Sequence, residues 1–559
     1  MEIYSKLKNP EFIKKVREAD CYKKFRDELF AIWNAHCTKP REALRYSDFK
    51  LFWETGDRGV YETVYFSRRL AISAASLLAV FYPEENKYLD RLMDEIYAIC
   101  DEYTWCLPAH QKVLEVNNNC VIDLFASETG FALSEIYAML GDRLDPLIID
   151  RIKVETERRI FKPFLAVSEY KWWEHGTNNW TAVCTGSVAC AFMIQRPDLV
   201  EGLLDRFNES MEYYLSGFED DGICIEGCGY WHYGFGFFTV YADMLKDFTN
   251  GKIDWFKNDK VRKVSSFIQK MFLSGNTCVS FADGGRYLHY HLGLCHYLKG
   301  LYPDEVVVYD PKFSYNYDGC ARYCLHLRSV LWLNEEYYNS PADDTVSAEY
   351  YADDSEWFIK RTKTYGFAAK GGNNNEHHNN NDVGAFIYAK NGKQIITDPG
   401  AGVYSRQYFD NKIRYSILEC SSRSHSVPII GGEYQPFGKT YASRETKYEN
   451  GVFSTDIAKA YKCEDLESLI RSFSFTDNSV TLTDKYAYSG DGEITERLVS
   501  LIKPTYENGV LSIEGTVIEF DPEKYDLELG EESSNRNTCY FIDFKLKNGV
   551  REFSCTIKG

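Results

Sequence analysis

Hydrophobic residues in roughly the first 310 positions recur at the spacing of one helix face, i, i+3, i+4 and i+7. This pattern predicts helices over residues 61–81, 89–103, 119–140, 180–193, 199–215 and 233–248. Breaker clusters at residues 141–142 and 196–198 mark boundaries between them. Long helices repeated without a clear strand are typical of a helical toroid or solenoid rather than a single bundle. We therefore predict an incomplete (α/α) toroid over residues 1–315 as the catalytic domain.

The pattern changes from about residue 320 onward, where apolar runs become short or alternate with polar residues. These runs predict strands over residues 329–333, 356–360, 385–389, 479–483 and 541–544. Asn391 and Gly392 stand between two such runs and favour a two-residue hairpin turn. Residues 316–559 are thus predicted to form an antiparallel β-sandwich, which makes the chain a multidomain α+β protein.

The composition narrows the classes of function. Of 559 residues, 44% are hydrophobic and 26% charged, which excludes a disordered chain. The net charge of −19 argues against a nucleic-acid partner, because phosphate binding needs a basic surface. A polyanionic substrate stays compatible, since a short basic lining inside a cleft can act against an acidic exterior. The 16% aromatic content also suits stacking on sugar rings, although most such rings belong to cores.

The N-terminal residues, the apolar stretches and the cysteines indicate in which cellular compartment the protein acts. The first twenty residues are charged throughout and lack the apolar segment of a signal peptide. The longest apolar stretch, residues 70–82, is too short to cross a bilayer and predicts a buried helix. Seventeen scattered cysteines form no CxxC pair and are typical of buried thiols in a reducing compartment. We therefore expect a cytoplasmic protein with no membrane partner.

Two segments of the helical region are dense in polar and aromatic residues. The first holds His175, Asn178 and Asn179 directly before a predicted helix. One asparagine there is explained by a helix N-cap, whereas two asparagines with a nearby histidine exceed what a cap needs. The second places Tyr230 and Tyr233 among glycines at another helix start, where a ligand can approach closely. Taken alone, this second segment is better explained by a buried aromatic patch.

A third polar segment, residues 371–382, contains two adjacent histidines and six asparagines and precedes a predicted strand. A solvated loop explains such a run in isolation. A histidine of this kind, Asp398 and His425 nevertheless form a plausible metal-binding set across a hairpin.

Together these segments resemble the heparinase II/III-like polysaccharide lyases, a group related to oligoalginate lyases and broad glycosaminoglycan lyases. The resemblance rests on HGTNNW, EGCGYWHYG and HHNNNDVGAFIYAKNGKQIITDPGAGVYSRQYF, followed by SHSVPIIGG. It spans roughly residues 55–435 and implies a toroid followed by antiparallel sheets. It also implies cleavage of uronic-acid-containing glycans by β-elimination, with an acidic oligosaccharide or polysaccharide as substrate.

The resemblance assigns roles to individual residues. Asn178 or Asn179, with His175, would neutralise the uronate carboxylate, so that charge moving onto it is stabilised as the enolate forms. Tyr233 would remove the C5 proton and protonate the leaving oxygen, with Tyr230 as the fallback. Because a free tyrosine titrates near pH ~10, this use needs nearby cations to lower its pKa. His378 would be the second-domain histidine of the site. The candidate substrate-binding residues are Trp180, Tyr230, Arg68 and Arg406, and for each arginine a solvated face is an equal alternative.

The metal of some members would fall on Asn380, Asp398 and His425. The family usually carries histidine where Asn380 stands, and an amide oxygen binds zinc less well than imidazole does. The metal is therefore left open among zinc, manganese and calcium, and no organic cofactor is expected.

Two other functions are compatible with the sequence. A glycoside hydrolase on a helical toroid would need two opposed carboxyl groups, for which Glu174 and Glu226 are candidates. A non-catalytic glycan-binding protein would keep the architecture alone, which the joint presence of His175, Asn178, Tyr233 and His378 disfavours. The kind of uronate, endo or exo action and assembly into a homo-oligomer are left open.

Overall fold

The computed structural model describes residues 2–111, 119–166, 170–315, 318–343 and 346–559. The chain forms two compact units, and each contains more than one stretch of sequence. The first comprises Met1–Gly217, Tyr230–Arg262 and Tyr290–Ala342, and the second comprises Phe218–Gly229, Lys263–His289 and Asp343–Gly559. This division differs from the single boundary expected at residue 315. Two segments from the helical part of the sequence pack with the β unit, and the first unit continues to Ala342.

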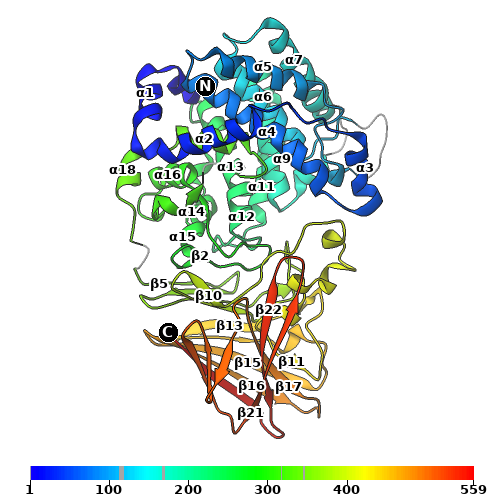
Figure 1. Ribbon diagram of the computed structural model, residues 1–559, viewed down its shortest axis with the longest axis vertical. Helices are drawn as coiled ribbons and strands as arrows, with labels where there is room; N and C mark the ends of the chain where they lie inside the picture. Colours follow the sequence, from blue (N-terminus) through cyan, green and yellow to red (C-terminus); the bar gives the residue numbers. More distant parts are fainter. Residues whose placement is uncertain (1, 112–118, 167–169, 316–317, 344–345) are drawn as a thin grey trace. The chain divides into compact units, whose positions relative to one another are not determined.

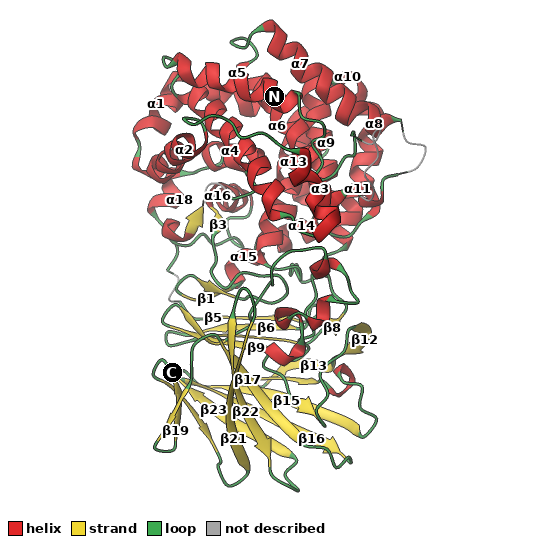
Figure 2. Cartoon of the chain, turned by 45° about the vertical axis from the view of Figure 1, so that its right-hand side comes forward, coloured by secondary structure: helices red, strands yellow, loops and turns green. Residues whose placement is uncertain are grey.

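The first unit is built from helices, drawn in red in Figure 2. Its longest is α4, whose apolar positions are almost all buried within the unit. The main helices are α1 (Pro10–Glu18), α2 (Lys23–His36), α3 (Tyr46–Thr55), α4 (Gly59–Phe81), α5 (Asn86–Cys100), α6 (Leu124–Leu140), α7 (Pro146–Thr156), α9 (Asn179–Gln195), α11 (Leu204–Ser216), α13 (Gly236–Phe248), α16 (Leu292–Leu301) and α17 (Tyr323–Leu331).

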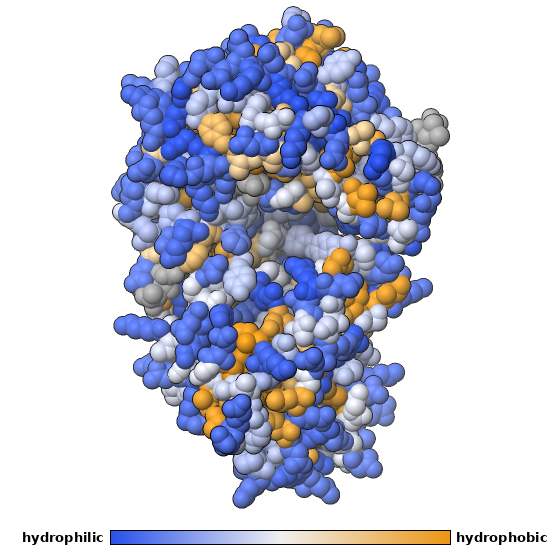
Figure 3. All heavy atoms as spheres, in the orientation of Figure 1, coloured by the Kyte–Doolittle hydropathy of each residue, from blue (hydrophilic) through white to orange (hydrophobic). Residues whose placement is uncertain are grey.

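Helix α4 is long and apolar enough to cross a bilayer, and it is longer than the apolar run 70–82 suggested. Most of its apolar window is nevertheless buried among neighbouring helices, as expected for the core helix of a globular domain. The face of the molecule in Figure 3 is mostly hydrophilic, with hydrophobic side chains in small separate groups.

The second unit contains three large antiparallel sheets, coloured yellow-green to red in Figure 1. A five-stranded sheet has the order β10-β9-β7-β6-β5, with β5 (Ala348–Ala352), β6 (Trp357–Arg361), β7 (Gly366–Lys370), β9 (Phe386–Lys390) and β10 (Lys393–Ile396). An eight-stranded sheet has the order β13-β14-β15-β16-β23-β20-β19-β18, with β13 (Arg444–Glu449), β14 (Val452–Asp456), β15 (Leu466–Phe475), β16 (Ser479–Tyr488), β18 (Thr505–Glu507), β19 (Val510–Ile513), β20 (Thr516–Phe520) and β23 (Glu552–Lys558). A four-stranded sheet has the order β11-β17-β22-β21, with β11 (Ile429–Ile430), β17 (Ile494–Ser500), β21 (Tyr525–Ser533) and β22 (Thr538–Leu546).

Aromatic side chains join these sheets into one core. Phe358 of the five-stranded sheet stacks on Phe453 of the eight-stranded sheet, with ring centroids 5.5 Å apart. On the four-stranded sheet, Phe544 packs against Phe553 of the eight-stranded sheet at 5.2 Å. Each such ring buries a large apolar area, so this cluster supplies much of the stabilisation of the unit.

The hairpin turn expected at residues 391–392 connects β9 to β10. Asn391 and Gly392 both have positive φ, at 52° and 74°, as the favoured turn of a tight hairpin requires. One strand prediction is wrong, because residues 329–331 end helix α17 and Trp332 is its C-cap. A short, fully buried apolar run has no period that separates helix from strand.

Candidate active site and metal centre

Tyr233 lies in a wide helical turn, Trp231–Phe235, that leads into α13. Its hydroxyl donates a 2.6 Å hydrogen bond to Oε1 of Glu128, a residue of α6. The guanidinium of Arg322 lies over the Tyr233 ring, 3.6 Å from the ring centroid, and also pairs with Asp318. A tyrosine hydroxyl, a carboxylate and a cation thus meet at one point of the helical unit.

The environment shifts the pKa of both hydrogen-bonded groups upward. Burial, followed by the negative charge of Glu128, raises the pKa of Tyr233 well above its ordinary value, while Arg322 acts in the opposite direction. Burial raises the pKa of Glu128 to about 8, although Arg322 and the hydrogen bond from Tyr233 lower it. Arg322 is the cation that the sequence led us to expect, but burial and Glu128 outweigh its effect on the pKa of Tyr233. Glu128 is instead a carboxylate suited to accept a proton near neutral pH.

Glu128 does not stand out in the sequence. Its one signal is a carboxyl group inside α6, where most neighbouring positions are buried and apolar or small. The same helix also carries Glu135, which forms a buried ion pair with Arg328. A carboxyl group inside a buried helix can therefore be reactive or structural. Only its hydrogen-bond and ion-pair partners in the folded protein distinguish the two.

The asparagine segment lies beside the Tyr233 turn. Asn178 is the N-cap of α9, and its Oδ1 accepts the backbone N–H of Trp180 at 3.1 Å. The cap explanation is therefore correct for this oxygen, while the amide NH2 is not used by the cap. Asn179 is buried, and a Cβ placed on Gly234 would lie only 3.1 Å from its Cβ. The close approach of Asn179 to Gly234 brings the start of α9 beside the turn that contains Tyr233.

His175 lies farther toward the surface than its predicted role suggests. It ends a short turn, Trp172–His175, and its side chain is 37% exposed. Its ring packs between Tyr170 and Tyr213, with centroids 4.4 and 4.5 Å away, and Nε2 lies 4.0 Å from Glu209. None of these contacts involves Tyr233 or Glu128, so the structure does not bring His175 together with them.

The predicted substrate-binding residues of this unit have different neighbours. The half-buried ring of Trp180 contacts Trp172 and His110, at 4.9 and 4.8 Å between centroids. Tyr230 is half-buried and directly precedes the turn that holds Tyr233. Arg68, on α4, donates to Glu102 at 2.8 Å and lines a cavity described below.

Glu174, a candidate acid for the hydrolase alternative, is fully buried and serves a structural purpose. Both of its oxygens accept hydrogen bonds from Arg206, at 2.6 and 2.8 Å. Oε1 also accepts the backbone N–H of Lys171. A carboxylate held in a bidentate arginine pair is poorly placed to act as a general acid.

In the β unit, His378 is held by a buried carboxylate. Asp283 accepts hydrogen bonds from Nδ1 of His378 at 2.6 Å, from Tyr404 at 2.9 Å and from Arg414 at 3.1 Å, and it also bonds Tyr408. Burial raises the pKa of Asp283, but the bond from His378 and the charge of Arg414 outweigh it and bring the pKa below its ordinary value. Arg406, exposed on the loop between the two tyrosines, makes none of these bonds to Asp283.

A second buried cluster in the β unit fits a metal ion. Ligand atoms of Asp382, Asp398 and His425 all lie within 4.8 Å of one another. Four polar atoms in this region are buried without a hydrogen-bond partner: Asn380 Oδ1, Asp382 Oδ2, Asp398 Oδ2 and His425 Nδ1. Unpaired buried acceptors are costly, and one divalent cation would satisfy all four. This set includes the three predicted residues and adds Asp382.

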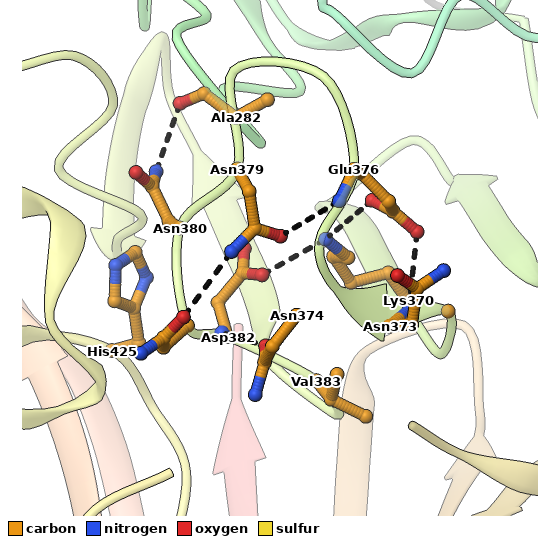
Figure 4. Close-up of polar contacts among 12 residues, drawn as sticks. Ala282, Lys370, Asn373, Asn374, Glu376, Asn379, Asn380, Asp382, Val383 and His425 are labelled. Carbon is orange, nitrogen blue, oxygen red and sulfur yellow. Dashed lines mark hydrogen bonds and ion pairs between the residues drawn. The ribbon is translucent and has the colours of Figure 1, made fainter. Parts of the chain in front are cut away.

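The surroundings orient these ligand atoms, as Figure 4 shows for Asn380, which bonds Ala282, and for Asp382, which bonds Lys370. Nε2 of His425 donates to the carbonyl of Glu419 at 3.0 Å, which leaves Nδ1 as the unprotonated nitrogen. Asn380 donates a hydrogen bond from its NH2 group to the carbonyl of Ala282 at 3.0 Å. Its Oδ1 therefore points away from Ala282 and has no hydrogen-bond partner. Nδ1 of His425 and Oδ2 of Asp398 are 3.2 Å apart but are not aligned as a hydrogen bond.

No family model matches the chain, and no curated protein sequence matches it. Solved structures of similar fold are found over almost the whole chain. Heparan sulfate lyase HepC from Pedobacter heparinus is 13% identical, with a TM-score of 0.59 over 100% of this chain and 87% of the other. A heparinase III structure is 12% identical, with a TM-score of 0.59 over 98% and 91%. The chondroitin AC lyase of Streptomyces coelicolor A3 is 9% identical, with a TM-score of 0.55 over 100% and 83%. The chain therefore has the fold of heparinase-like polysaccharide lyases.

Proposed function

We propose that this protein is a lyase that cleaves uronic-acid-containing glycans, of glycosaminoglycan or alginate type, by β-elimination. The products would carry a 4,5-unsaturated uronate at the new end. The observation that carries the proposal is the hydrogen bond from Tyr233 to Glu128 beside Asn178 and Asn179. The likeness of the fold to solved lyases supports the same reaction class.

The reaction begins with loss of the proton on C5, next to the uronate carboxylate. The amide NH2 groups of Asn178 and Asn179 would donate to that carboxylate. Such donors stabilise the charge that moves onto the carboxyl oxygens as the enolate forms. Fixed donors in a partly buried site need no reorganisation at the moment of reaction, so their effect on the barrier is larger than in water.

Tyr233 transfers the proton. Its hydroxyl oxygen takes the C5 proton while its own proton passes along the 2.6 Å hydrogen bond to Glu128. This relay avoids a free tyrosinate, whose formation the raised pKa of Tyr233 opposes. In the second half the proton returns through Tyr233 to the glycosidic O4, the C4–O4 bond breaks and the C4–C5 double bond forms. The role of His378 stays a prediction of the resemblance, and His175, whose ring packs between Tyr170 and Tyr213, takes no part in this step.

The finer features of the architecture belong to the same proposal. We assign the helical unit as an incomplete (α/α) toroid that holds the reacting residues, and the β unit as an antiparallel sandwich. The three sheets joined through one aromatic core support the second assignment. All seventeen cysteines are free thiols, which supports action in the cytoplasm on imported oligosaccharides.

The metal set Asn380, Asp382, Asp398 and His425 would hold one divalent cation, zinc, manganese or calcium. Its contribution would be structural, since it would balance the buried carboxylate of Asp398, add to the ion pair that Asp382 makes with Lys370, and join three separated segments of the β unit. It would thereby fix the turn that carries His378, two residues before Asn380.

Product analysis tests the proposal against hydrolysis. The protein is incubated with heparan, chondroitin, hyaluronan and alginate oligosaccharides, and the fragments are weighed by mass spectrometry. Elimination gives fragments whose masses add up to that of the parent chain. Hydrolysis adds one water for each cleavage, and that result would replace the proposal with the hydrolase alternative.

A further inference from the structure

The helical unit contains a cavity of about 850 Å³ that none of the reacting residues lines. It lies among α3, the start of α4 and the end of α5, together with the segment that leads into α3. Its volume is in the range of small-molecule sites, about 300–1,000 Å³. The lining residues are Arg41, Ala43, Leu44, Arg45, Tyr46, Phe49, Tyr61, Arg68, Tyr97, Ala98, Asp101, Glu102 and Tyr103.

Aromatic rings form much of the wall and remain open to solvent. Tyr46, Tyr97 and Tyr103 are 69%, 48% and 51% exposed. Three exposed tyrosines around one cavity, backed by the buried rings of Phe49 and Tyr61, make a surface on which the C–H face of a sugar ring can stack. The hydroxyl groups at the tyrosine edges add hydrogen-bonding positions.

The charges of the wall favour an anion. Glu95 forms ion pairs with both Arg41 and Arg91, and Glu102 forms them with both Arg68 and Arg69. The cavity wall itself carries three arginines and two acidic residues, which leaves one positive charge in excess within a chain of net charge −19. The remaining charged lining residues, Arg45 and Asp101, each have a partner of opposite sign.

The arginines have unused donors. The Nε of Arg68 is buried and has no hydrogen-bond partner. Burial is the main cause that lowers the pKa of Arg68; the charges of Arg69 and Arg41 add to it, and Glu102 acts in the opposite direction. A carboxylate or sulfate would take up these donors in charge-assisted hydrogen bonds.

We propose that this cavity is a binding site for an acidic sugar unit, one that bears a carboxylate or sulfate, separate from the unit that reacts. The proposal rests on the proposed function in one respect, that the acidic sugar belongs to the glycan substrate. Arg69 connects the two regions, because it bonds Glu102 of this wall and also lines the small cavity that contains Glu128. The site would hold a distant part of the same acidic chain.

Two substitutions test the site without leaving a carboxylate unpaired. Arg41→Gln leaves Glu95 bound to Arg91, and Arg68→Gln leaves Glu102 bound to Arg69. Arg91→Gln is the matched control, since Arg91 bonds the same Glu95 but does not line the cavity. All three are made in the Tyr233→Phe background, so that the ligand is not consumed during the measurement.

Binding is measured by calorimetric titration with an unsulfated uronate hexasaccharide, a sulfated counterpart and a neutral hexasaccharide. Arg41→Gln and Arg68→Gln should each weaken binding of an acidic hexasaccharide about tenfold, the usual effect of losing a charge-assisted hydrogen bond. Arg91→Gln should leave the Kd within about twofold, and the neutral sugar should not bind measurably. The unsulfated and sulfated arms show which anionic group is preferred.

Equal Kd values for the Arg41, Arg68 and Arg91 variants would overturn the inference, and so would tight binding of the neutral hexasaccharide or no binding of either acidic one. Failure of the proposed function has a different signature. If the unsubstituted protein forms no unsaturated product while the Arg41 and Arg91 variants still differ in Kd, the binding site stands and the lyase assignment falls.

Discussion

Nδ1 of His378 lies 2.6 Å from Oδ2 of Asp283, and this bond joins two segments of the β unit separated by 95 positions. The His378 backbone has a φ of 57°, a strained conformation for a residue with a side chain. Because Asp283 is buried and ionised, it can only accept, so Nδ1 carries the proton and Nε2 is the nitrogen left for other contacts. The carboxylate thus determines how the ring is oriented.

Asp283→Asn should lower turnover by about 10²-fold, the cost of a slight misplacement of a catalytic group. If Asp283 acts through His378, the same substitution in a His378→Ala background should have little further effect. Steady-state kinetics of the two single variants and the double variant measure this coupling. Asp543→Asn, which breaks the Arg497 ion pair of the same unit, is the stability control and should leave turnover unchanged. Additive losses would assign Asp283 a purely structural role.

Tyr233→Phe removes only the hydroxyl, so the melting temperature should change little while turnover falls by roughly 10²- to 10⁴-fold. Substrate affinity should change far less, because Asn178 and Asn179 provide the contact with the carboxylate. Tyr241→Phe is a suitable control, since that buried hydroxyl bonds only the nearby Asn208 in the described contacts. A near-normal rate for Tyr233→Phe would transfer the role to Tyr230.

Because of Glu128, the rate of the reaction should increase with pH. As the proton acceptor it is active when ionised, so kcat/KM should increase with pH through its pKa of about 8. Glu128→Gln should lose this pH dependence together with most of the activity. The measurement is a pH–rate profile of both proteins, and an unchanged pH dependence in Glu128→Gln would assign it to another group.

The same pKa predicts a stability difference. The folded pKa of about 8 lies above the ordinary 4.5, so the stabilisation from protonated Glu128 is complete below pH 4.5 and is lost as pH rises through about 8. Glutamine stays neutral at every pH. The melting temperature of Glu128→Gln, relative to that of the native protein, should therefore increase between these two pH values. Above them the difference between the two melting temperatures should be constant. A pH-independent difference would contradict the raised pKa.

The buried cluster around His425 predicts about one divalent ion per chain by elemental analysis. Chelation should lower the melting temperature of the native protein, because a ligand that binds only the folded state stabilises it. His425→Ala and Asp382→Asn should reduce metal content and remove the response to chelator. His296→Ala, which truncates a buried histidine elsewhere, should lower the melting temperature but keep that response. A native protein without metal would remove this site from the account.

The spacing of apolar residues predicted six of the helices and four of the strands named above. Strands β6, β9, β16 and β22 and the Asn391–Gly392 turn follow it closely, because period and turn chemistry are local properties. The interleaving of the two units could not be predicted. Residues 218–229 and 263–289 join the β unit through contacts with residues far along the chain, which no local pattern records.

The candidate site shows the same limit. Motifs pointed to Asn178, Tyr233 and His378, since each stands in an unusual polar or glycine-rich run. Glu128 and Asp283 have no such run, and their importance depends on a partner 105 or 95 positions away. Asp382 was recognised only as part of a motif, because its free oxygen becomes evident only when the other ligand atoms are placed around it.

The most direct test of the central claim is to follow ultraviolet absorbance of the C4–C5 double bond while the purified protein acts on a panel of uronate oligosaccharides. The account predicts that absorbance rises in step with chain cleavage on at least one uronate glycan, and that Tyr233→Phe and Asn178→Ala both suppress the rise. Cleavage that creates new reducing ends without any double bond would contradict elimination and favour hydrolysis.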